Sequence, residues 1–133
     1  MAQAQMRRAI ECGVPDNQQY LHPLLKKNYG NWRYHDRPRP GVLHHVAHGG
    51  DEVWTVRAGT QRQMDVFTIR RLCDIADRYA EGHVRFTTRS NIAFMVSAEA
   101  KVAPLIAELE RNGFPVGGTG NSVSMIAHTQ GWL

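Results

Sequence analysis

Arginines and threonines alternate with apolar residues in two short segments, residues 53–57 and 84–89, which read as β-strands. Successive side chains of a strand point to opposite faces of a sheet, so we expect the polar side chains on one face. They are Thr55, Arg57, Arg85, Thr87 and Arg89. The apolar residues Trp54, Val56 and Phe86 should pack behind this face. A guanidinium binds a carboxylate or phosphate through two parallel hydrogen bonds, so the pattern predicts a surface for a polyanion.

A glycine-rich segment is a second candidate for anion binding. Residues 117–122 read Gly-Gly-Thr-Gly-Asn-Ser, and the backbone N–H groups of such a turn can form a concave anion site. No Lys-Ser or Lys-Thr pair follows, so the segment is not a Walker A loop. His44, His45 and His48 have a spacing near that of metal ligands, but no nearby carboxylate or cysteine completes a set. We therefore expect neither a metal site nor catalytic residues.

Charge and composition favour an anionic partner. The formal net charge is +4 at pH 7, which suits a nucleic acid, a phosphate ligand, a polycarboxylate cofactor or an acidic protein surface. Cys12 and Cys73 are too few for a zinc or iron–sulfur motif, and we expect buried free thiols. Residues 1–12 lack the apolar core of a signal peptide, and no stretch approaches the roughly 20 apolar residues of a membrane span. A soluble, cytoplasmic protein is expected.

The first fifty residues differ from the rest. Pro38 and Pro40 stand at alternate positions, which favours extended backbone, and little periodicity is present. We therefore expect residues 1–50 to form an extended N-terminal arm for subunit contact and residues 51–133 to form the folded domain. The apolar side chains that should hold the arm against a partner or the domain are Tyr20, Leu21, Leu24, Leu25, Tyr29, Trp32 and Tyr34.

A regular pattern of strands and helices begins at residue 51. The expected elements are a strand over residues 52–58, a helix over 65–80, strands over 83–88 and 92–96, a helix ending at Asn112 and a strand over 122–129. Asp65 is the expected N-cap of the first helix, and Gly82 its stop. This βαββαβ order predicts an α+β, ferredoxin-like domain with both helices on one sheet face. The arginines should lie on the other, open face, although a one-residue slip would reverse this.

Several motifs resemble one family. Residues 53–60, 85–91 and 117–133 are similar to segments of dissimilatory sulfite reductase beta subunits, within the siroheme-dependent sulfite and nitrite reductase superfamily. The Arg-x-Thr-x-Arg pattern of residues 85–89 also resembles assimilatory members, whereas residues 117–131 favour the dissimilatory beta subunits. The resemblance extends into the expected arm through residues 27–30 and 40–43.

The resemblance implies an oxidoreductase of two alpha and two beta subunits. Such a complex carries siroheme coupled to [4Fe-4S] clusters, interconverts sulfite and a reduced sulfur species by a six-electron reaction, and works with a small sulfur-carrier protein. Siroheme has eight carboxylates, for which an arginine-lined face is a suitable partner. By resemblance, the residues that would hold or border the tetrapyrrole are Arg57, Arg85, Thr87, Thr88, Arg89, Asn91, Thr119, Gly120 and Asn121.

The chain also departs from the family pattern. It stops at Leu133, before the cysteines that bind the clusters, so we expect the N-terminal part of a subunit, inactive alone. Ser124 and Met125 stand where the catalytic type carries a substrate-side arginine, which implies a structural beta-side tetrapyrrole, either siroheme or its metal-free form. Residues 34–41 resemble members that work in the oxidative direction, and the reductive direction stays open.

Two other classes fit the residues taken alone. A basic ferredoxin-like module could bind nucleic acid on an open sheet face, but such sheets stack bases on aromatic residues, whereas this one should offer arginine and threonine. A non-catalytic assembly module could use the same face to bind a partner subunit without a cofactor. An absorption spectrum would distinguish these classes, because a tetrapyrrole colours the protein.

Overall fold

The computed structural model describes residues 18–61 and 63–119. Within these ranges the chain forms one five-stranded antiparallel sheet with the strand order β1-β2-β3-β5-β4. The strands are β1 (Trp32–Arg39), β2 (Val42–Ala47), β3 (Glu52–Gly59), β4 (Val84–Phe86) and β5 (Asn91–Val96). The α-helices are α1 (Pro23–Lys27), α2 (Val66–Tyr79) and α3 (Val102–Arg111), with 3₁₀ turns at η2 (Gln18–Tyr20) and η3 (Glu99–Lys101).

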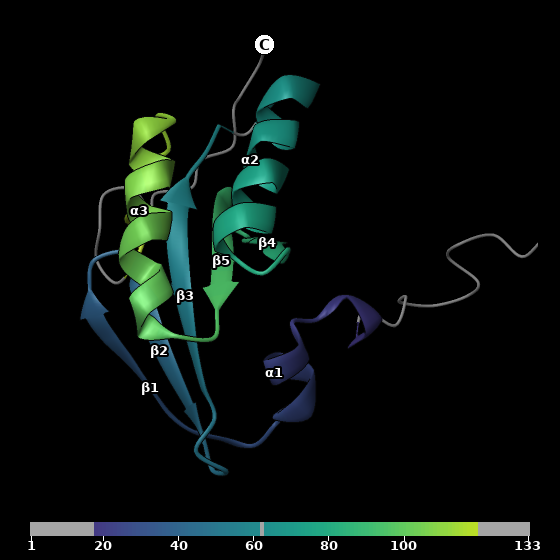
Figure 1. Cartoon of the computed structure of the whole chain (residues 1–133), viewed down its shortest axis with the longest axis vertical. Coiled ribbons are helices and arrows are strands. Elements are labelled where there is room, and N and C mark those ends of the chain that lie inside the picture. Colours follow the sequence, from purple (N-terminus) through teal and green to yellow (C-terminus); the bar gives the residue numbers. More distant parts are fainter. Residues whose placement is uncertain (1–17, 62, 120–133) are drawn as a thin grey trace, which may run out of the picture.

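Helices α2 and α3 lie side by side over one face of the sheet, and the core lies between the two layers (Figure 1). On the sheet side the core contains alternate residues of the central strands, because successive side chains point to opposite faces. The buried core residues are Val42, Trp54, Val56, Ala58, Leu72, Ile75, Ala76, Ala80, Ile92, Phe94, Val96, Val102, Leu105, Leu109 and Phe114. The α+β, ferredoxin-like prediction is confirmed, with β3, α2, β4, β5 and α3 following in the expected order. The expected strand over residues 122–129 lies outside the described residues.

Helix α2 begins and ends close to where its sequence predicts. The Asp65 carboxylate accepts a hydrogen bond from the Thr68 backbone N–H at 2.7 Å, which is the predicted N-cap. Beyond the helix, Gly82 has a φ of 73°, the left-handed conformation that suits glycine at a helix end. The expectation that Cys73 is buried is wrong, because its side chain is exposed. The buried residues of α2 are Leu72, Ile75 and Ala76, and position 73 falls beside this stripe rather than in it.

Residues 32–47 belong to the sheet and not, as the sequence predicts, to a separate extended arm. They form the hairpin of β1 and β2, and β2 pairs with β3 from Val42 opposite Val56 to Val46 opposite Glu52. The backbone is extended, as the prolines predict, but it belongs to the sheet. Pro38 is compatible with this because β1 is an edge strand, where a residue without an N–H group can face solvent.

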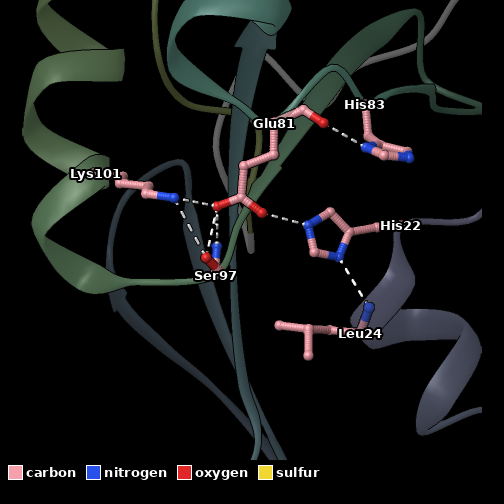
Figure 2. A network of polar contacts seen from close by, with 6 residues as sticks. All are labelled: His22, Leu24, Glu81, His83, Ser97 and Lys101. Atoms are coloured by element: carbon pink, nitrogen blue, oxygen red, sulfur yellow. Dashed lines mark hydrogen bonds and ion pairs between the residues drawn. The ribbon is translucent and has the colours of Figure 1, made fainter.

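A hydrogen-bond network around Glu81 holds α1 to the rest of the domain (Figure 2). His22 is buried, and its Nδ1 accepts a hydrogen bond from the Leu24 backbone N–H at 3.2 Å. The proton is therefore assigned to Nε2, which donates to Glu81 Oε2 at 2.7 Å. Glu81 Oε1 accepts from Lys101 Nζ at 2.6 Å, and from the Ser97 backbone N–H at 3.0 Å and its Oγ at 2.6 Å.

These contacts set the ionisation of Glu81. Partial burial alone would raise its pKa, but the hydrogen bonds from Lys101, Ser97 and His22 outweigh burial and lower the pKa from 4.5 to about 2. Glu81 also has a φ of 57°, a conformation that costs a non-glycine residue free energy. A charged, conformationally strained residue between α2 and β4 thus joins the start of α1 to the end of β5 and to η3. Among the described residues, no helix is long and apolar enough to cross a membrane.

Candidate anion-binding site

Two of the predicted arginines flank one position of the central sheet. Arg57 of β3 and Arg85 of β4 both lie opposite Ala93 of β5. Its neighbour Phe94 points into the core beneath the helices, so Ala93 and both arginines are on the face that α2 and α3 do not cover. The predicted strand parity is therefore confirmed for Arg57 and Arg85.

The arginines line a cavity of about 430 Å³ that is partly open to solvent. Its lining residues are Arg57, Arg85, Phe86, Thr87, Thr88 and Arg89. The expectation that Phe86 packs behind the arginine face is wrong, because 64% of its surface is exposed. Phe86 lies opposite the core residue Ile92, on the helix side of the sheet, but β4 ends there and the ring is not in the core that the described residues form. The side chains that the cavity offers from the arginine face are therefore cationic and hydroxyl groups.

A tight turn carries the tip of this site. Thr87 and Asn91 close the turn: the Thr87 N–H donates to the Asn91 carbonyl at 2.9 Å, and the Asn91 N–H donates to Thr87 Oγ1 at 3.2 Å. Ser90 has a φ of 58° within the turn, and its carbonyl accepts a hydrogen bond from Thr60 Oγ1 at 2.7 Å. Thr88 and Arg89 are therefore held at an exposed tip beside Arg85.

The charges of the cavity are not neutralised within the part of the chain that the structure describes. None of the ion pairs there involves Arg57, Arg85 or Arg89. Burial lowers the pKa of Arg57, and the nearby cations Arg85, Arg89 and Arg37 lower it further. Converging like charges repel, so the arrangement favours a bound anion.

Two buried nitrogens at the site have no hydrogen-bond partner among the described residues. They are Arg57 Nε and Nδ2 of Asn91, whose residue is only 5% exposed. Asn91 lies opposite Gly59 and has the same strand parity as Ala93, so it belongs to the arginine face. A buried donor without a partner costs free energy, about 1–3 kcal/mol. Both nitrogens are therefore candidate donors to a ligand.

The glycine-rich segment lies beside Arg57, but its groups are used differently from the prediction. The Gly117 N–H donates to the Arg57 carbonyl at 3.0 Å instead of facing an anion. The Gly118 carbonyl accepts a bond from Arg57 Nη1 at 3.4 Å, and Thr119 Oγ1 accepts one from the Gly41 N–H at 2.9 Å. The predicted site residues Gly120 and Asn121 lie outside the described residues.

Histidines near the arginine face were not predicted as part of it. His45 lies on this face, where its Nδ1 shares a 2.6 Å hydrogen bond with His35 Nδ1 and its Nε2 bonds Thr55 Oγ1 at 3.1 Å. Burial lowers the pKa of His45 to about 4, and the charges of His35, Arg85, His44 and Arg57 act in the same direction. Recognising β2 as a strand would have revealed this placement through its alternation.

The three clustered histidines do not form one metal site. His44 lies on the helix-covered face, where its ring stacks on Trp54 with centroids 4.0 Å apart. His45 points to the opposite face, so the two rings cannot bind one ion. Within residues 18–61 and 63–119, no group of three or more histidine, cysteine, aspartate or glutamate residues is placed to hold a metal.

Comparisons with known proteins agree with the fold. Residues 45–112 match the family described as the nitrite/sulfite reductase ferredoxin-like half domain. Three curated relatives are each named sulfite reductase, dissimilatory-type subunit beta. The relative from Archaeoglobus fulgidus is 48% identical over 91% of this chain, and that from Nitratidesulfovibrio vulgaris is 47% identical over 95%. The relative from Megalodesulfovibrio gigas is 45% identical over 95%. The chain covers 35% of each of the first two relatives and 51% of the third.

Proposed function

The chain belongs to the nitrite/sulfite reductase ferredoxin-like half-domain family, and we propose that it is part of the beta subunit of a dissimilatory sulfite reductase. In this proposal it works with an alpha subunit in a complex of two alpha and two beta subunits and with a small sulfur-carrier protein. The complex interconverts sulfite and a reduced sulfur species by six electrons, in the cytoplasm. The beta-side site is structural and supports a catalytic site formed by the alpha subunit.

The observation that carries the proposal is the cationic cavity, whose charges no described residue neutralises, together with two buried donors on the same sheet face, Arg57 Nε and Asn91 Nδ2, that lack a partner among the described residues. A tetrapyrrole with many carboxylates fits this set, because guanidinium groups bind carboxylates through paired hydrogen bonds. Arg85 and Arg89 have exposed side chains that can follow carboxylates at the edge of such a ligand.

The residues of this chain would bind and orient the tetrapyrrole. Thr87 and Thr88 can donate hydroxyl hydrogen bonds to carboxylates that the arginines leave partly unsatisfied. Thr119, Gly120 and Asn121 would border the macrocycle. When bound, siroheme with an adjacent [4Fe-4S] cluster supplies the electron transfer to sulfur, and the protein supplies charge and position. The cluster ligands are proposed to lie outside this chain, which covers 35% of the length of the first two relatives.

The N-terminal segment is proposed to contact the alpha subunit. Tyr20 and Tyr29 flank α1 and are 73% and 66% exposed, and Tyr34 of β1 is 46% exposed. Large exposed aromatic side chains are common at protein interfaces. Subunit contact is thus retained as a role for residues 18–31, together with the outer strand β1, in place of a separate arm over residues 1–50.

The test is an absorption spectrum of the full-length subunit that contains this chain, co-expressed with its alpha subunit. The variant is Arg85→Ala combined with Arg89→Ala, and the matched control is Arg70→Ala combined with Arg71→Ala on the exposed side of α2. Losing two charge-assisted contacts should lower tetrapyrrole occupancy about tenfold or more, with assembly unchanged by gel filtration. Unchanged tetrapyrrole bands in the cavity variant would overturn the proposal.

A further inference from the structure

Four hydrogen bonds join three segments, distant in sequence, around Arg57. The Arg57 backbone N–H donates to the Gly41 carbonyl at 2.7 Å, and the Arg57 carbonyl accepts from the Gly117 N–H at 3.0 Å. The Gly41 N–H donates to Thr119 Oγ1 at 2.9 Å. Arg57 Nη1 donates to the Gly118 carbonyl at 3.4 Å. The turn between β1 and β2, the end of β3 and the glycine-rich segment thus form one closed ring of contacts.

Gly41 meets two separate requirements at this junction. Its φ is 77°, which an L side chain rarely adopts. A Cβ at this position would lie 2.6 Å from the Gly117 backbone nitrogen and 2.6 Å from Val116 Cγ1, closer than such contacts normally come. The backbone at residue 41 or at residue 117 would therefore have to shift, together with the Val116 side chain. Gly30 differs, since its φ is 78° but nothing lies within 4 Å of a Cβ built there.

The Arg57 side chain needs a restraint because its neighbours repel it. Arg85, Arg89 and Arg37 lie near enough to lower its pKa, so repulsion favours a guanidinium turned away from them. Its Nε is buried and without a partner among the described residues, and the side-chain hydrogen bond that the described residues give it is the long contact of 3.4 Å from Nη1 to the Gly118 carbonyl. Moving residues 117 and 118 would remove that contact.

We propose that Gly41 and Thr119 are positioning residues for Arg57, so that the β1–β2 turn is a working part of the anion site. Gly41 allows the glycine-rich segment to approach β3, and the Thr119 hydroxyl fixes the two turns to each other. Gly41 does not have to touch the ligand, and Thr119, although it would border the macrocycle, acts here through its hydrogen bond from the Gly41 N–H. This inference rests on the proposed function, because it concerns how the same site holds a polycarboxylate tetrapyrrole.

The experiment measures tetrapyrrole retention by the full-length subunit in complex with its alpha subunit. Samples are dialysed at increasing NaCl concentration, and the absorbance of the remaining tetrapyrrole is divided by protein concentration. The variants are Gly41→Ala with the control Gly30→Ala, and Thr119→Val with the conservative Thr119→Ser. Arg57→Gln is included as the reference for losing the guanidinium.

We expect Gly41→Ala and Thr119→Val to release the tetrapyrrole at severalfold lower salt than wild type. Their release should also depend less steeply on salt, as in Arg57→Gln, because one screened cationic contact is lost. Gly30→Ala and Thr119→Ser should behave like wild type, since the first position is open and serine keeps the hydroxyl acceptor. A general loosening of the fold would not make the release of tetrapyrrole depend less steeply on salt, and it would not leave Thr119→Ser like wild type.

The outcomes separate this inference from the proposed function. If Arg57→Gln releases the tetrapyrrole but Gly41→Ala and Thr119→Val match wild type, the positioning role is wrong and the site stands. If Arg57→Gln also matches wild type, the proposed function of the arginine face fails. Should Gly41→Ala not yield folded protein, the comparison of Thr119→Val with Thr119→Ser decides, and equal behaviour of those two overturns the inference.

Discussion

Replacing Glu81 by glutamine should make the amides of α1 exchange with solvent about tenfold faster, because α1 is then held less tightly. Glutamine keeps the shape of the side chain and the left-handed backbone, so the change isolates the charge. The fall of the Glu81 pKa from 4.5 to about 2 corresponds to at most about 3.4 kcal/mol, since one pH unit is worth about 1.36 kcal/mol. Glu81 is 26% exposed and Lys101 is 49% exposed, so solvent screening reduces this to ~1–2 kcal/mol.

Hydrogen–deuterium exchange with mass spectrometry on the full-length subunit measures this effect. At pH 7 the amides of residues 22–28 should exchange about tenfold faster in Glu81→Gln, because about 1.4 kcal/mol is a factor of ten. A carboxylate with a lowered folded-state pKa stabilises the fold above its unfolded value. The difference from wild type, corrected for intrinsic exchange, should therefore be full above pH 4.5 and vanish as the pH falls toward 2.

The matched control is Glu110→Gln, which removes one negative charge from an exposed position of α3. It should leave exchange in residues 22–28 unchanged. Equal exchange in Glu81→Gln and wild type would refute the reasoning, because the network would then contribute nothing to holding α1. A similar increase in Glu110→Gln would refute it as well, by tracing the effect to net charge.

Two further predictions concern the sheet. Burial first, and then the charges of His35 and Arg85, lower the His45 pKa from 6.5 to about 4, so the unfolded chain binds a proton that the folded chain does not. The free energy of unfolding, measured with urea, should fall as the pH drops from 6.5 to 4, and His45→Gln should lessen that fall. A fall in His45→Gln as steep as in wild type would contradict this. Phe94→Ala should cost about 3–5 kcal/mol in urea unfolding because Phe94 is fully buried. Phe86→Ala, at a 64% exposed position, should cost within about 0.5 kcal/mol, and equal losses would contradict the assigned packing.

The elements that could be predicted are those whose signals are local. The apolar spacing of α2, its N-cap Asp65 and its stop at Gly82 lie within one stretch of chain, so they locate the helix without knowledge of its neighbours. The arginine face also followed from a local rule, because alternation along β3 and β4 depends on the strand alone. This places Arg57 and Arg85 on one face of the sheet.

The remaining features depend on contacts between distant segments. Strand β2 is defined by pairing with β3, and the exposed, proline-containing β1 shows no apolar alternation. The dipeptide Pro40-Gly41 was the available signal of a turn. Because β2 was missed, so were the contact of Gly41 with Arg57 and the place of His45 beside the arginines. The exposure of Phe86 could not be predicted, since it depends on where β4 ends relative to the helices.

The first three strands form a meander whose connections are short. Residues 40–41 link β1 to β2, and residues 48–51 link β2 to β3. Closing short loops costs little chain entropy, whereas β5 reaches β3 only after α2 and β4 have been made. Residues 32–59 therefore form the part of the sheet that a growing polypeptide can assemble first during synthesis. The turn that contacts Arg57 would then be in place before the other arginines of the site emerge from the ribosome.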